Sequence, residues 1–597
     1  MDEIQETKIG EIVRQAEDEF INGQTTISKY VSVSMSDELN KIDAYLNSKH
    51  ISGETDNLER EKPFFNIVTA AVNVWYRATD IDRKNIKIKA GKLKDTITSF
   101  LATVHLQDWM RRNNFGMFLN DWGLSLARYG SSVIKMVEQD GELKSIVVPW
   151  NRLIVDSVDF DNNPIIEVLE LTESQLRKRE GYNQKIVEKL CDTISTRETT
   201  DKQKKDNKAN YIKLYEVHGE FPLSYLTGKE KDEDTYVQQM HVISFVASKE
   251  EGKYDDFTLI SGRETKNPYM ITHLIKEEGQ TLSYGAVRHL FEAQWMMNHT
   301  AKAIKDQLDL ASKLIFQTSD GNFVGQNALS AIETGDILIH AVNQPLTQLA
   351  NSSHDITSLQ NFGSQWKSLA NEITGISESM LGNTAPSGTA WRQVEALLQE
   401  SHSLFELMTE NKGLYVEQMI RNVISHLKKK MDTTKEVSAT LEDYDLTRID
   451  KMYVRNEATK KTNRALVEKV LNEEIVSPLD QQMMMDENQM ALKEGLSDLG
   501  NQRFFKPSEV DDKTWKEVFK DMEWDVVVDV TGESVDKDAV TTLNTMLQTI
   551  AKNPMILQDP NAKLLFNKIL NETAIVSPLE ISSLPSPTAP KQPQPVG

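Results

Sequence analysis

The sequence predicts an α+β protein that is rich in helix. Segments with strand-like alternation lie among short helical patterns before residue 275, and long stretches with apolar residues three or four positions apart follow. With 597 residues the chain exceeds the size of one compact core, so we expect two to four subdomains.

The first sixty residues are polar and charged, with a helical pattern in "KIGEIVRQAEDEFI". The first clearly apolar block is "KPFFNIVTAAVNVWYRATD" (62–80). Its apolar residues recur at Phe65, Val68, Val72 and Trp75, a spacing that predicts a helix.

Residues 116–275 combine helix and strand signals. The stretch 116–137 predicts a buried helix, a Gly-Ser break and then a strand, and the next apolar runs predict short strands around a turn at 162–164. A polar charge run at 199–210 predicts a loop. "YIKLYEVHGEFP" and "QMHVISFVAS" then predict two strands separated by the charged insertion "TGKEKDEDT".

A long helix is predicted over 283–312, because the stretch has no Pro and no internal Gly after residue 285. Its apolar stripe consists of Val287, Leu290, Phe291, Gln294, Met297, Ala301, Ile304 and Leu308. Residues 314–342 give β-like runs broken by glycines, and a second helix is predicted over 355–377.

An uncharged stretch, "SMLGNTAPSGTAW" (379–391), separates that helix from a third one of roughly forty residues, on the order of 60 Å long. The third helix has apolar residues at Trp391, Val394, Leu398, Phe405, Met408, Tyr415, Met419, Val423 and Leu427. Residues 450–580 are helix-rich with one strong strand, "WDVVVDV" (524–530), and the Pro-rich residues 577–597 predict a disordered tail.

Charge and cysteine content narrow the class of protein. The net charge of −22 disfavours general nucleic-acid binding, since phosphate contacts come mainly from Lys and Arg. The single cysteine, Cys191, allows no disulfide within the chain, which suits a reducing compartment. No apolar window approaches eighteen residues, so we expect neither a signal peptide nor a membrane span.

The sequence offers little for catalysis, and we expect no enzyme, metal or cofactor. It has no phosphate-binding P-loop, no nucleophile elbow, no zinc-protease motif and no paired cysteines. "DFDNNPIIEVLE" (159–170) has acidic residues at calcium-loop spacing, but Pro164 replaces the required glycine, so a β-turn with acidic shoulders is the better interpretation. His299, His402 and Cys191 have no ligand-spaced partners and are interpreted as ordinary structural residues.

Two lysines of the first long helix, Lys302 and Lys305, lie off its apolar stripe. Most exposed helix lysines only solvate a face, but in a ring of identical subunits each would become a girdle of positive charge. Both interpretations stay open. The run 428–430 ends the third helix, where cations favour the helix dipole.

The order of these elements resembles the portal, or head-to-tail connector, family of tailed bacteriophages. "VPWNRLIVDSVDFDN" resembles the portal stretch in which a strand follows the first core helices, and "SYGAVRHLFEAQWMMNHTAKAIKDQLDLASKLIFQ" resembles the helix that leads into the clip. "EITGISESMLGNTAPSGTAWRQVEALLQES" resembles the segment that precedes the long helix. The resemblance covers about residues 60–430, and beyond them only the order of elements matches.

The resemblance implies a portal fold with wing, stem, clip and crown regions assembled as a ring. Its implied segments are a wing α+β domain (1–282), a descending stem helix (283–312), a clip (313–354), an ascending stem helix (355–377), a tunnel loop (378–389), a long wing helix (390–430) and a helical crown region (431–576) before the tail.

The tunnel loop would lie at the narrowest part of a DNA channel. A loop of small uncharged residues contacts DNA without the affinity that each cation–phosphate contact adds, and its glycines allow it to shift. The alternative is an ordinary helix–helix connection. The implied channel residues are Ser379, Gly382, Asn383, Thr384, Ser387, Gly388 and Thr389, with Lys302 and Lys305 as candidates for the channel lining.

In the family's terms, the chain would form a ring, expected to be a dodecamer, at one capsid vertex of the virion, after synthesis in the host bacterial cytoplasm. Its expected partners are the terminase large subunit, adaptor and tail proteins, the major capsid protein, and double-stranded DNA that is packaged and ejected without sequence specificity. The clip would dock these proteins through Asp320, Asn322, Phe323, Gln326 and Asp336.

Two other interpretations remain. The chain could be another virion structural or scaffold protein with a long helical hairpin and no DNA channel. It could also be an enzyme whose dispersed site uses Asp156, Asp159 and Glu170 with a metal, although no nucleophile–base or metal spacing supports one.

Overall fold

The structure, a computed structural model, confirms the predicted α+β class. Residues 1–528 form one compact unit of mixed helix and strand. Residues 529–597, including the predicted Pro-rich tail, lie outside the described part of the chain. The described residues are 7–23, 34–57, 59–83, 86–90, 96–139, 141–198, 211–247, 254–312, 316–317, 319, 342–344, 347–348, 356–377, 380–381, 391–430, 436–441, 443–472, 474, 476–510, 513–520 and 524–528.

The larger sheet has five antiparallel strands in the order β4-β5-β6-β7-β8. The strands are β4 (Leu153–Ile154), β5 (Ile165–Thr172), β6 (Tyr211–Pro222), β7 (Tyr236–Ala247) and β8 (Tyr254–Arg263). Helices α6 (Glu173–Lys178) and α7 (Gln184–Glu198) supply residues to the core on one face, and α1 (Lys8–Asn22) supplies residues to the core on the other. β6 shows why both faces are covered: its alternating residues Ile212 and Leu214 enter the first core, and Tyr215 and Val217 enter the second.

A buried carboxylate holds α1 on this sheet. Asp256 of β8 accepts hydrogen bonds from the Thr7 backbone N–H at 2.7 Å and from the Thr7 hydroxyl at 3.0 Å, and it pairs with Arg14 at 2.9 Å. A side chain at Gly10 would collide with it, because a Cβ there would lie 2.0 Å from Asp256 Oδ2. The carboxylate therefore sits at the helix N-terminus, where negative charge is stabilising.

The smaller sheet is antiparallel, in the order β3 (Glu142–Val148), β2 (Ser131–Gln139), β9 (Tyr269–His273). Helix α5 (Phe115–Tyr129) precedes β2, and its Trp122 donates a hydrogen bond to Thr272 Oγ1 at 2.8 Å. The break between α5 and β2 is Gly130, with φ of 75°, as the Gly-Ser signal predicted. A Cβ at Gly130 would lie 2.5 Å from the backbone of Tyr284 and Gly285, so glycine is required there.

Helices α2 (Met35–Leu46), α3 (Val68–Ala78), α4 (Thr96–Arg112) and α9 (Ala286–His289) form a helical layer around α5. The long helix α12 runs over Trp391–Lys430 as predicted and packs against β3 and β9 of the smaller sheet. On α12, the predicted stripe residues Phe405, Met408, Met419, Val423 and Leu427 are buried.

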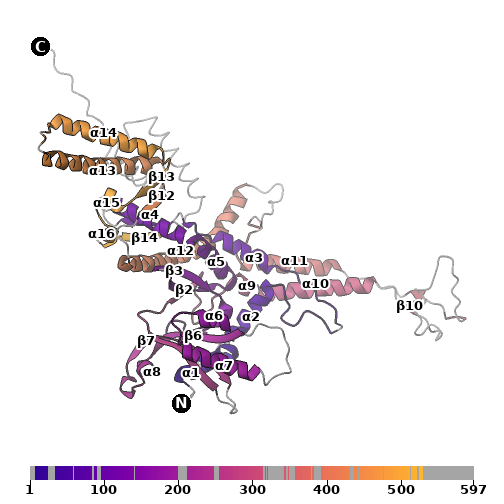
Figure 1. Cartoon of the computed structure of the whole chain (residues 1–597). Helices are drawn as coiled ribbons and strands as arrows, with labels where there is room; N and C mark the ends of the chain where they lie inside the picture. Colours follow the sequence, from indigo (N-terminus) through magenta and orange to yellow (C-terminus); the bar gives the residue numbers. More distant parts are fainter. Residues whose placement is uncertain are drawn as a thin grey trace, which may run out of the picture. The chain divides into compact units, whose positions relative to one another are not determined.

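Two antiparallel segments follow α9 in the chain. Helix α10 (Phe291–Ala311) and helix α11 (Ile356–Ile373) lie side by side, as Figure 1 shows. Beyond α10, the described strands β10 (Phe316–Gln317) and β11 (Thr347–Gln348) pair with each other. We call α10 and α11 together the stem hairpin.

The C-terminal part of the described chain holds α13 (Asp443–Leu471), α14 (Pro478–Ser497), α15 (Pro507–Val510) and α16 (Trp515–Lys520). It also holds two short strands, β12 (Val437–Thr440) and β13 (Gln502–Phe505), that pair with each other. The predicted strand at 524–530 is confirmed as β14 (Trp524–Val528), and it pairs with β1 (Ile86–Ala90) from the N-terminal half. Short helical turns at Trp150–Arg152, Ser224–Thr227 and Glu230–Asp232 complete the described elements.

The structure corrects three predictions about local structure. The helix predicted over 62–80 begins only at Val68, and Phe65 precedes it and is 49% exposed. The helix predicted over 283–312 is interrupted at Leu290, which separates α9 from α10. The region after residue 431 is not helical throughout: β12 and β13 are four-residue strands, too short to give a clear alternation.

Candidate functional site

The loops that sequence reasoning placed at the channel and the clip fall mostly outside the described residues. The candidates outside are Ser379, Gly382, Asn383, Thr384, Ser387, Gly388 and Thr389 of the tunnel loop, and Asp320, Asn322, Phe323, Gln326 and Asp336 of the clip. Of the stretch between α11 and α12, the structure describes residues 374–377 and 380–381, and the Met380 N–H donates to the Ser377 carbonyl at 3.0 Å.

The elements on either side of that stretch are described, and the stem hairpin is the first of them. A glycine brings its two helices together: a Cβ at Gly363 of α11 would lie 3.4 Å from Thr300 Cγ2 and 3.9 Å from Met297 Sδ of α10. Gly363 and Ala370 are the buried residues of α11, so small side chains form its contact face. The helix pair therefore buries little apolar surface of its own.

Large apolar side chains of the stem hairpin face solvent instead. On α10, Trp295 is 54% exposed and Leu308 is 52% exposed, although Leu308 belongs to the predicted core stripe. On α11, Phe362, Leu369 and Ile373 are exposed by 42%, 41% and 46%. Exposed apolar residues gathered on one element typically mark an interaction surface.

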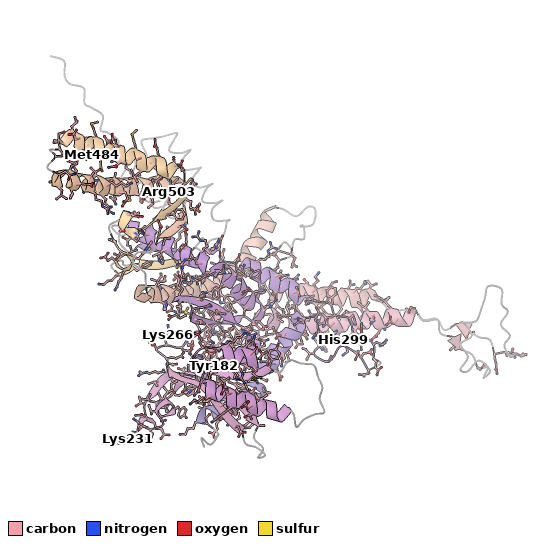
Figure 2. All side chains as sticks on the ribbon, in the orientation of Figure 1. Tyr182, Lys231, Lys266, His299, Met484 and Arg503 are labelled. Atoms are coloured by element: carbon pink, nitrogen blue, oxygen red, sulfur yellow. The ribbon has the colours of Figure 1, made fainter. Side chains whose placement is uncertain are left out.

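The exposed aromatic rings are paired along the helices. His299 stacks on Trp295 with ring centroids 5.7 Å apart, and its position on α10 is labelled in Figure 2. Phe362 and Trp366 of α11 meet edge to face at 6.3 Å. This places His299 next to an aromatic ring and gives it no metal-ligand partner among the described residues.

The two candidate lysines of α10 have partners within the chain. Lys305 Nζ donates to the Glu61 carbonyl at 2.8 Å, and Lys302 Nζ lies 4.0 Å from Asp306 Oδ2. Arg60 reaches the same side of α10 and pairs with Asp306 at 3.0 Å. Acidic and basic groups thus alternate here, and whether either lysine faces a channel stays a prediction.

Residues 60–67 form a strap along α10. Gln294 and Asn298, both buried, bind its backbone: Gln294 Oε1 accepts from the Ile67 N–H at 3.0 Å, and Asn298 Oδ1 accepts from the Phe65 N–H at 3.0 Å. Gln294 was predicted as part of an apolar stripe, but its amide is the group that anchors the strap. The strap explains why Phe65, which was predicted to be helical, lies outside α3.

The root of the stem hairpin is fixed to the helical layer. Trp75 of α3, 1% exposed, donates its indole N–H to the carbonyl of Thr374, just after α11, at 3.0 Å. Its ring meets Phe405 of α12 edge to face at 6.3 Å. The chain therefore enters the 378–389 stretch from a rigid, buried position and leaves it into α12.

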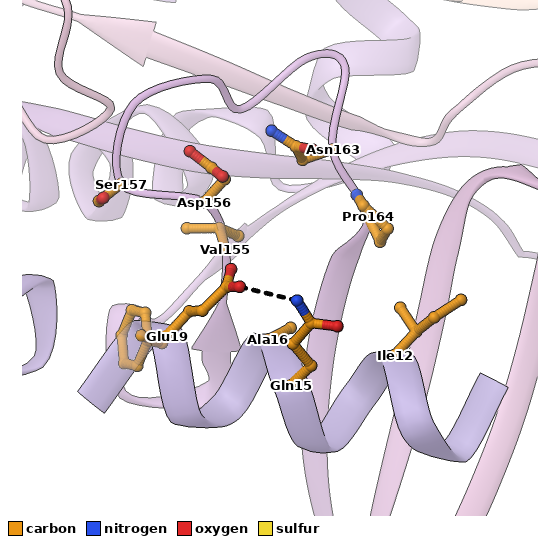
Figure 3. A pocket seen from close by; sticks show the side chains of 10 residues that line it. Ile12, Gln15, Ala16, Glu19, Val155, Asp156, Ser157, Asn163 and Pro164 are labelled. Atoms are coloured by element: carbon orange, nitrogen blue, oxygen red, sulfur yellow. Dashed lines mark hydrogen bonds between the residues drawn. The ribbon is translucent and has the colours of Figure 1, made fainter. Parts of the chain in front are cut away.

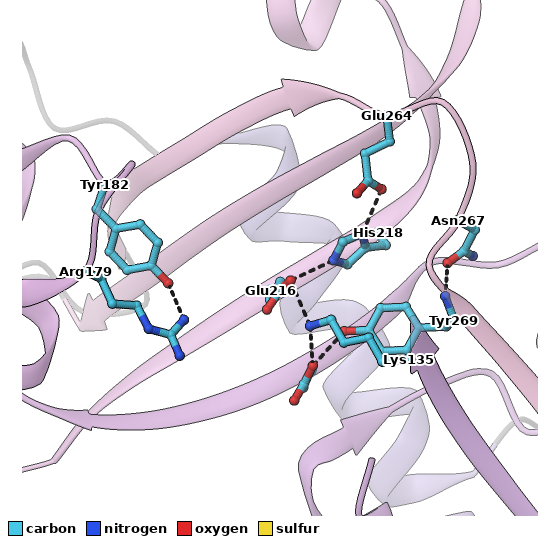
Figure 4. Close-up of polar contacts among 9 residues, drawn as sticks. Lys135, Arg179, Tyr182, Glu216, His218, Glu264, Asn267 and Tyr269 are labelled. Carbon is cyan, nitrogen blue, oxygen red and sulfur yellow. Dashed lines mark hydrogen bonds and ion pairs between the residues drawn. The ribbon is translucent and has the colours of Figure 1, made fainter. Parts of the chain in front are cut away.

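The densest cluster of charged groups lies elsewhere, between the two sheets (Figure 4). Lys135 of β2 pairs with Glu167 of β5 at 2.7 Å and with Glu216 of β6 at 2.9 Å. Tyr269 of β9 donates its hydroxyl to Glu167 at 2.7 Å, and His218 of β6 contacts Glu216 at 2.9 Å. The cluster thus joins both sheets through buried polar groups.

The histidine of this cluster has a carboxylate at each ring nitrogen. Nε2 of His218 is 2.9 Å from Glu216 and Nδ1 is 2.8 Å from Glu264. Burial lowers the pKa of His218, but the two carboxylates outweigh burial and raise it. Because ionised carboxylates only accept hydrogen bonds, this geometry requires the doubly protonated imidazolium.

The other members of the cluster titrate consistently with that charge. Burial raises the pKa of Glu216, but His218 and Lys135 outweigh burial and lower it to about 2. Burial lowers the pKa of Lys135, and Glu216 and Glu167 more than compensate, so its pKa is raised. With His218 only 1% exposed, the arrangement is closed to a substrate and is suited to fixing one sheet on the other.

The residues of the enzyme alternative do not assemble into a site. Asp156 Oδ1 accepts from the backbone N–H groups of Val158 and Asp159, and Asp159 Oδ1 accepts from those of Asp161 and Asn162, so both carboxylates order a turn. The turn joins β4 to β5, which agrees with the prediction of a β-turn flanked by acidic residues. Glu170 lies farther along β5.

A cavity of about 180 Å³ adjoins this turn (Figure 3). Ile12, Gln15 and Glu19 of α1 line one side, and Asp156 and Asn163 are among the residues on the other. Gln15 donates to Glu19 at 2.9 Å across its floor. Among the residues that the structure describes, no three His, Cys, Asp or Glu side chains are grouped to hold a metal ion.

The structure also bears on three further features singled out in the sequence. Cys191 of α7 is buried in the core on one face of the larger sheet, and burial raises the pKa of its thiol. His402 is part of α12. Within the described ranges, no helix is both long enough and apolar enough to cross a membrane.

Comparison with known proteins does not identify the chain. Neither the models of protein families nor the curated proteins that were searched gave a match.

Proposed function

We propose that this chain is the subunit of a portal ring of a tailed bacteriophage. In this proposal, copies of the chain surround a channel at one capsid vertex, through which double-stranded DNA is packaged and later ejected. The terminase large subunit docks first, adaptor and tail proteins dock later, and the major capsid protein surrounds the ring. The chain itself performs no chemistry.

The observation that carries the proposal is the exposed apolar surface of the stem hairpin. Two helices that bury little between them, through Gly363 and Ala370, keep Trp295, Phe362 and Leu369 in solvent. A monomer gains nothing from this arrangement, whereas neighbouring copies placed side by side would bury these rings. Neighbouring stem hairpins in a closed ring supply such a cover by symmetry.

The order of the elements supports the same proposal. The stem hairpin is bracketed by the β10–β11 pair at one end and by the Trp75–Thr374 contact at the other, and it is followed by a forty-residue helix. A rigid root directly before 378–389 is what a loop needs if it is to contact moving DNA without displacing the subunit. The net charge of −22 favours passage of a polyanion over its capture.

Imaging of the purified full-length protein tests the proposal. We expect ring-shaped particles with a bore wide enough for duplex DNA, and a mass that is a whole multiple of 67.8 kDa, twelve-fold in the implied dodecamer. Compact monomers, or oligomers without a bore, would overturn it and favour a scaffold role.

A pair of variants makes the test specific to the stem hairpin. Phe362→Ser combined with Leu369→Ser should abolish rings and leave folded smaller species. Met117→Ser on α5, a residue that is 67% exposed, serves as the matched control and should assemble as the wild type does. If the two variants assemble equally well, the exposed surface of the stem hairpin is not needed for assembly, and the proposal loses its main support.

A further inference from the structure

The helices α13 and α14 form an antiparallel pair, here called the C-terminal hairpin. Helix α14 has twenty residues and none of them is buried. The pair is held by few groups: Thr462 of α13 receives a hydrogen bond from Asn488 at 3.0 Å and lies 3.6 Å from Met485 Sδ. Since a helix in water gains most of its stability from packing, α14 lacks an expected partner.

Both outward faces of this hairpin are apolar near its tip. Val467, Val470 and Leu471 of α13 are exposed by 60%, 66% and 77%. Leu479 and Met483 of α14 are exposed by 71% and 56%. The hairpin is drawn in Figure 2, where Met484 of α14 is labelled.

Helix geometry places four of these five residues away from the contact inside the hairpin; Val470 lies only about 80° round α13 from Thr462. At roughly 100° per residue, Leu471 lies about 180° round α13 from Thr462, and Val467 lies about 140° from it. Met483 lies about 160° round α14 from Met485, by the same spacing. The hairpin therefore has an outer face on each helix. On α13 that face is uncovered only from Arg464 to the tip, because Asn456 and Lys460 on the same side donate hydrogen bonds to the Val510 and Ser508 carbonyls of α15.

The same two faces have opposite charges one layer below the tip. Arg464 lies on the outer face of α13, about 160° from Thr462, and Glu487 lies on the outer face of α14, about 160° from Met485. Both side chains are exposed, and in the described part of the chain neither takes part in an ion pair. Asp486 adds a second exposed carboxylate beside Glu487.

The layers of the two faces match in height. Counted from the tip, Leu471 is level with Leu479, Val467 with Met483, and Arg464 with Glu487, each within about two residues, on the order of 3 Å. Two copies placed side by side, with their hairpins parallel, would thus oppose apolar to apolar and cation to carboxylate. Rotation about the axis of the proposed ring preserves these heights, and this step rests on the proposed function.

We infer that the outer face of α13 docks on the outer face of α14 of a second copy of this chain. The contact is head-to-tail, because the two faces differ, and it repeats the antiparallel packing that α13 and α14 already make within one chain. Repeated around a ring, the contact covers the tip of every hairpin on both sides, with the tips of α13 and α14 alternating.

Charge exchange tests this contact. Arg464→Glu alone and Glu487→Arg alone should each weaken self-association by about fivefold per contact, because attraction becomes repulsion. The double variant should recover wild-type assembly, and so should an equimolar mixture of the two single variants, in which copies alternate. Arg455→Glu is the matched control: it is also an exposed arginine of α13, but it lies about 20° round the helix from Thr462.

Cysteine cross-linking tests the register. Val467→Cys combined with Met483→Cys should give a ladder of oxidised oligomers up to the closed ring, and neither single variant should give more than traces. The native Cys191 is buried and should not contribute. Unchanged assembly in both single charge variants, or no ladder, overturns the inference and leaves residues 529–597 or another protein as the cover.

The two proposals can fail separately. If the protein forms rings with a bore and substitutions at residues 464 and 487 do not change assembly, the hairpin contact is refuted and the portal proposal is not. If head-to-tail oligomers form that depend on those residues but have no bore, the portal proposal is refuted and the hairpin contact is not.

Discussion

A buried lysine on the long helix gives the sharpest test of the packing. Lys412 of α12 is 2% exposed, and its Nζ donates to the Thr79 carbonyl at 2.5 Å and lies 5.3 Å from the centre of the Trp122 ring. Burial lowers its pKa to about 8 from the ordinary value of 10.5, which Asp80 only partly offsets. The folded chain therefore holds the proton less tightly than the unfolded chain does.

The perturbation is Lys412→Met, which keeps the length of the side chain and removes the charge. The lowered pKa corresponds to a cost of roughly 3 kcal/mol for the charged form at pH 7. Losing the bond to the Thr79 carbonyl costs about 1 kcal/mol, and the contact with Trp122 is largely kept by sulfur. We expect the variant to be more stable than the wild type at pH 7, by about 1–2 kcal/mol.

The pH dependence separates this explanation from a simple packing effect. Between about pH 8 and 10.5 the unfolded wild type binds more protons than the folded protein, so its free energy of unfolding should rise through that window. Lys412→Met lacks this rise, so its advantage should disappear near pH 10. Urea unfolding at pH 7 and pH 9.5 measures the difference in free energy of unfolding between variant and wild type. Lys451→Met, at an exposed lysine of α13, is the control. A variant that is less stable at pH 7, with the same pH slope as the wild type, would refute the reasoning.

Three other outcomes are expected. Gly130→Ala should lower the free energy of unfolding by at least about 3 kcal/mol, because its Cβ would meet backbone at 2.5 Å, while Gly141→Ala, with a similar φ of 78° and open space around it, should cost only about 1 kcal/mol; thermal denaturation compares them. His218 has a raised pKa, so its stabilisation is complete below about pH 6.5 and is lost as pH rises through the folded-state pKa; urea unfolding from pH 6 to pH 9 should show this loss in the wild type and not in His218→Gln. Asp256→Ala should cost about 2–3 kcal/mol and expose the amides of α1 to hydrogen exchange, leaving those of Glu216 and its strand protected.

Periodicity predicted the long elements well, because each buries a continuous face. The helix at 391–430 and the strands at 211–222 and 524–528 all have apolar residues at their own period over many positions. Lys412 is an exception to the apolar pattern of α12 that the sequence itself shows. It falls at a stripe position between Met408 and Val416, which are both buried. A lysine in that register signals a buried cation, although not its partner.

Groups that act through distant partners could not be predicted. Lys135, Glu167 and Glu216 meet across two sheets from positions far apart in the chain, and no local spacing indicates it. Gln294 was assigned to an apolar stripe because residue spacing alone does not distinguish a side chain that packs through its methylene groups from one whose amide binds a strap. The candidate channel residues had a compositional signal, but they lie outside the described residues and remain predictions.

The stripe on α10 shows where periodicity has a second use. Met297 of that stripe is buried, yet Leu308, on the same face of the helix about three turns farther along, is 52% exposed. An apolar stripe predicts that a helix face is buried, but it does not predict whether the same chain or another copy buries it. A stripe that continues past the point where its own chain stops covering it therefore indicates a surface reserved for assembly. The exposed face of α14 has the same character, so the stem hairpin and the C-terminal hairpin are the two places where a second copy should first be sought.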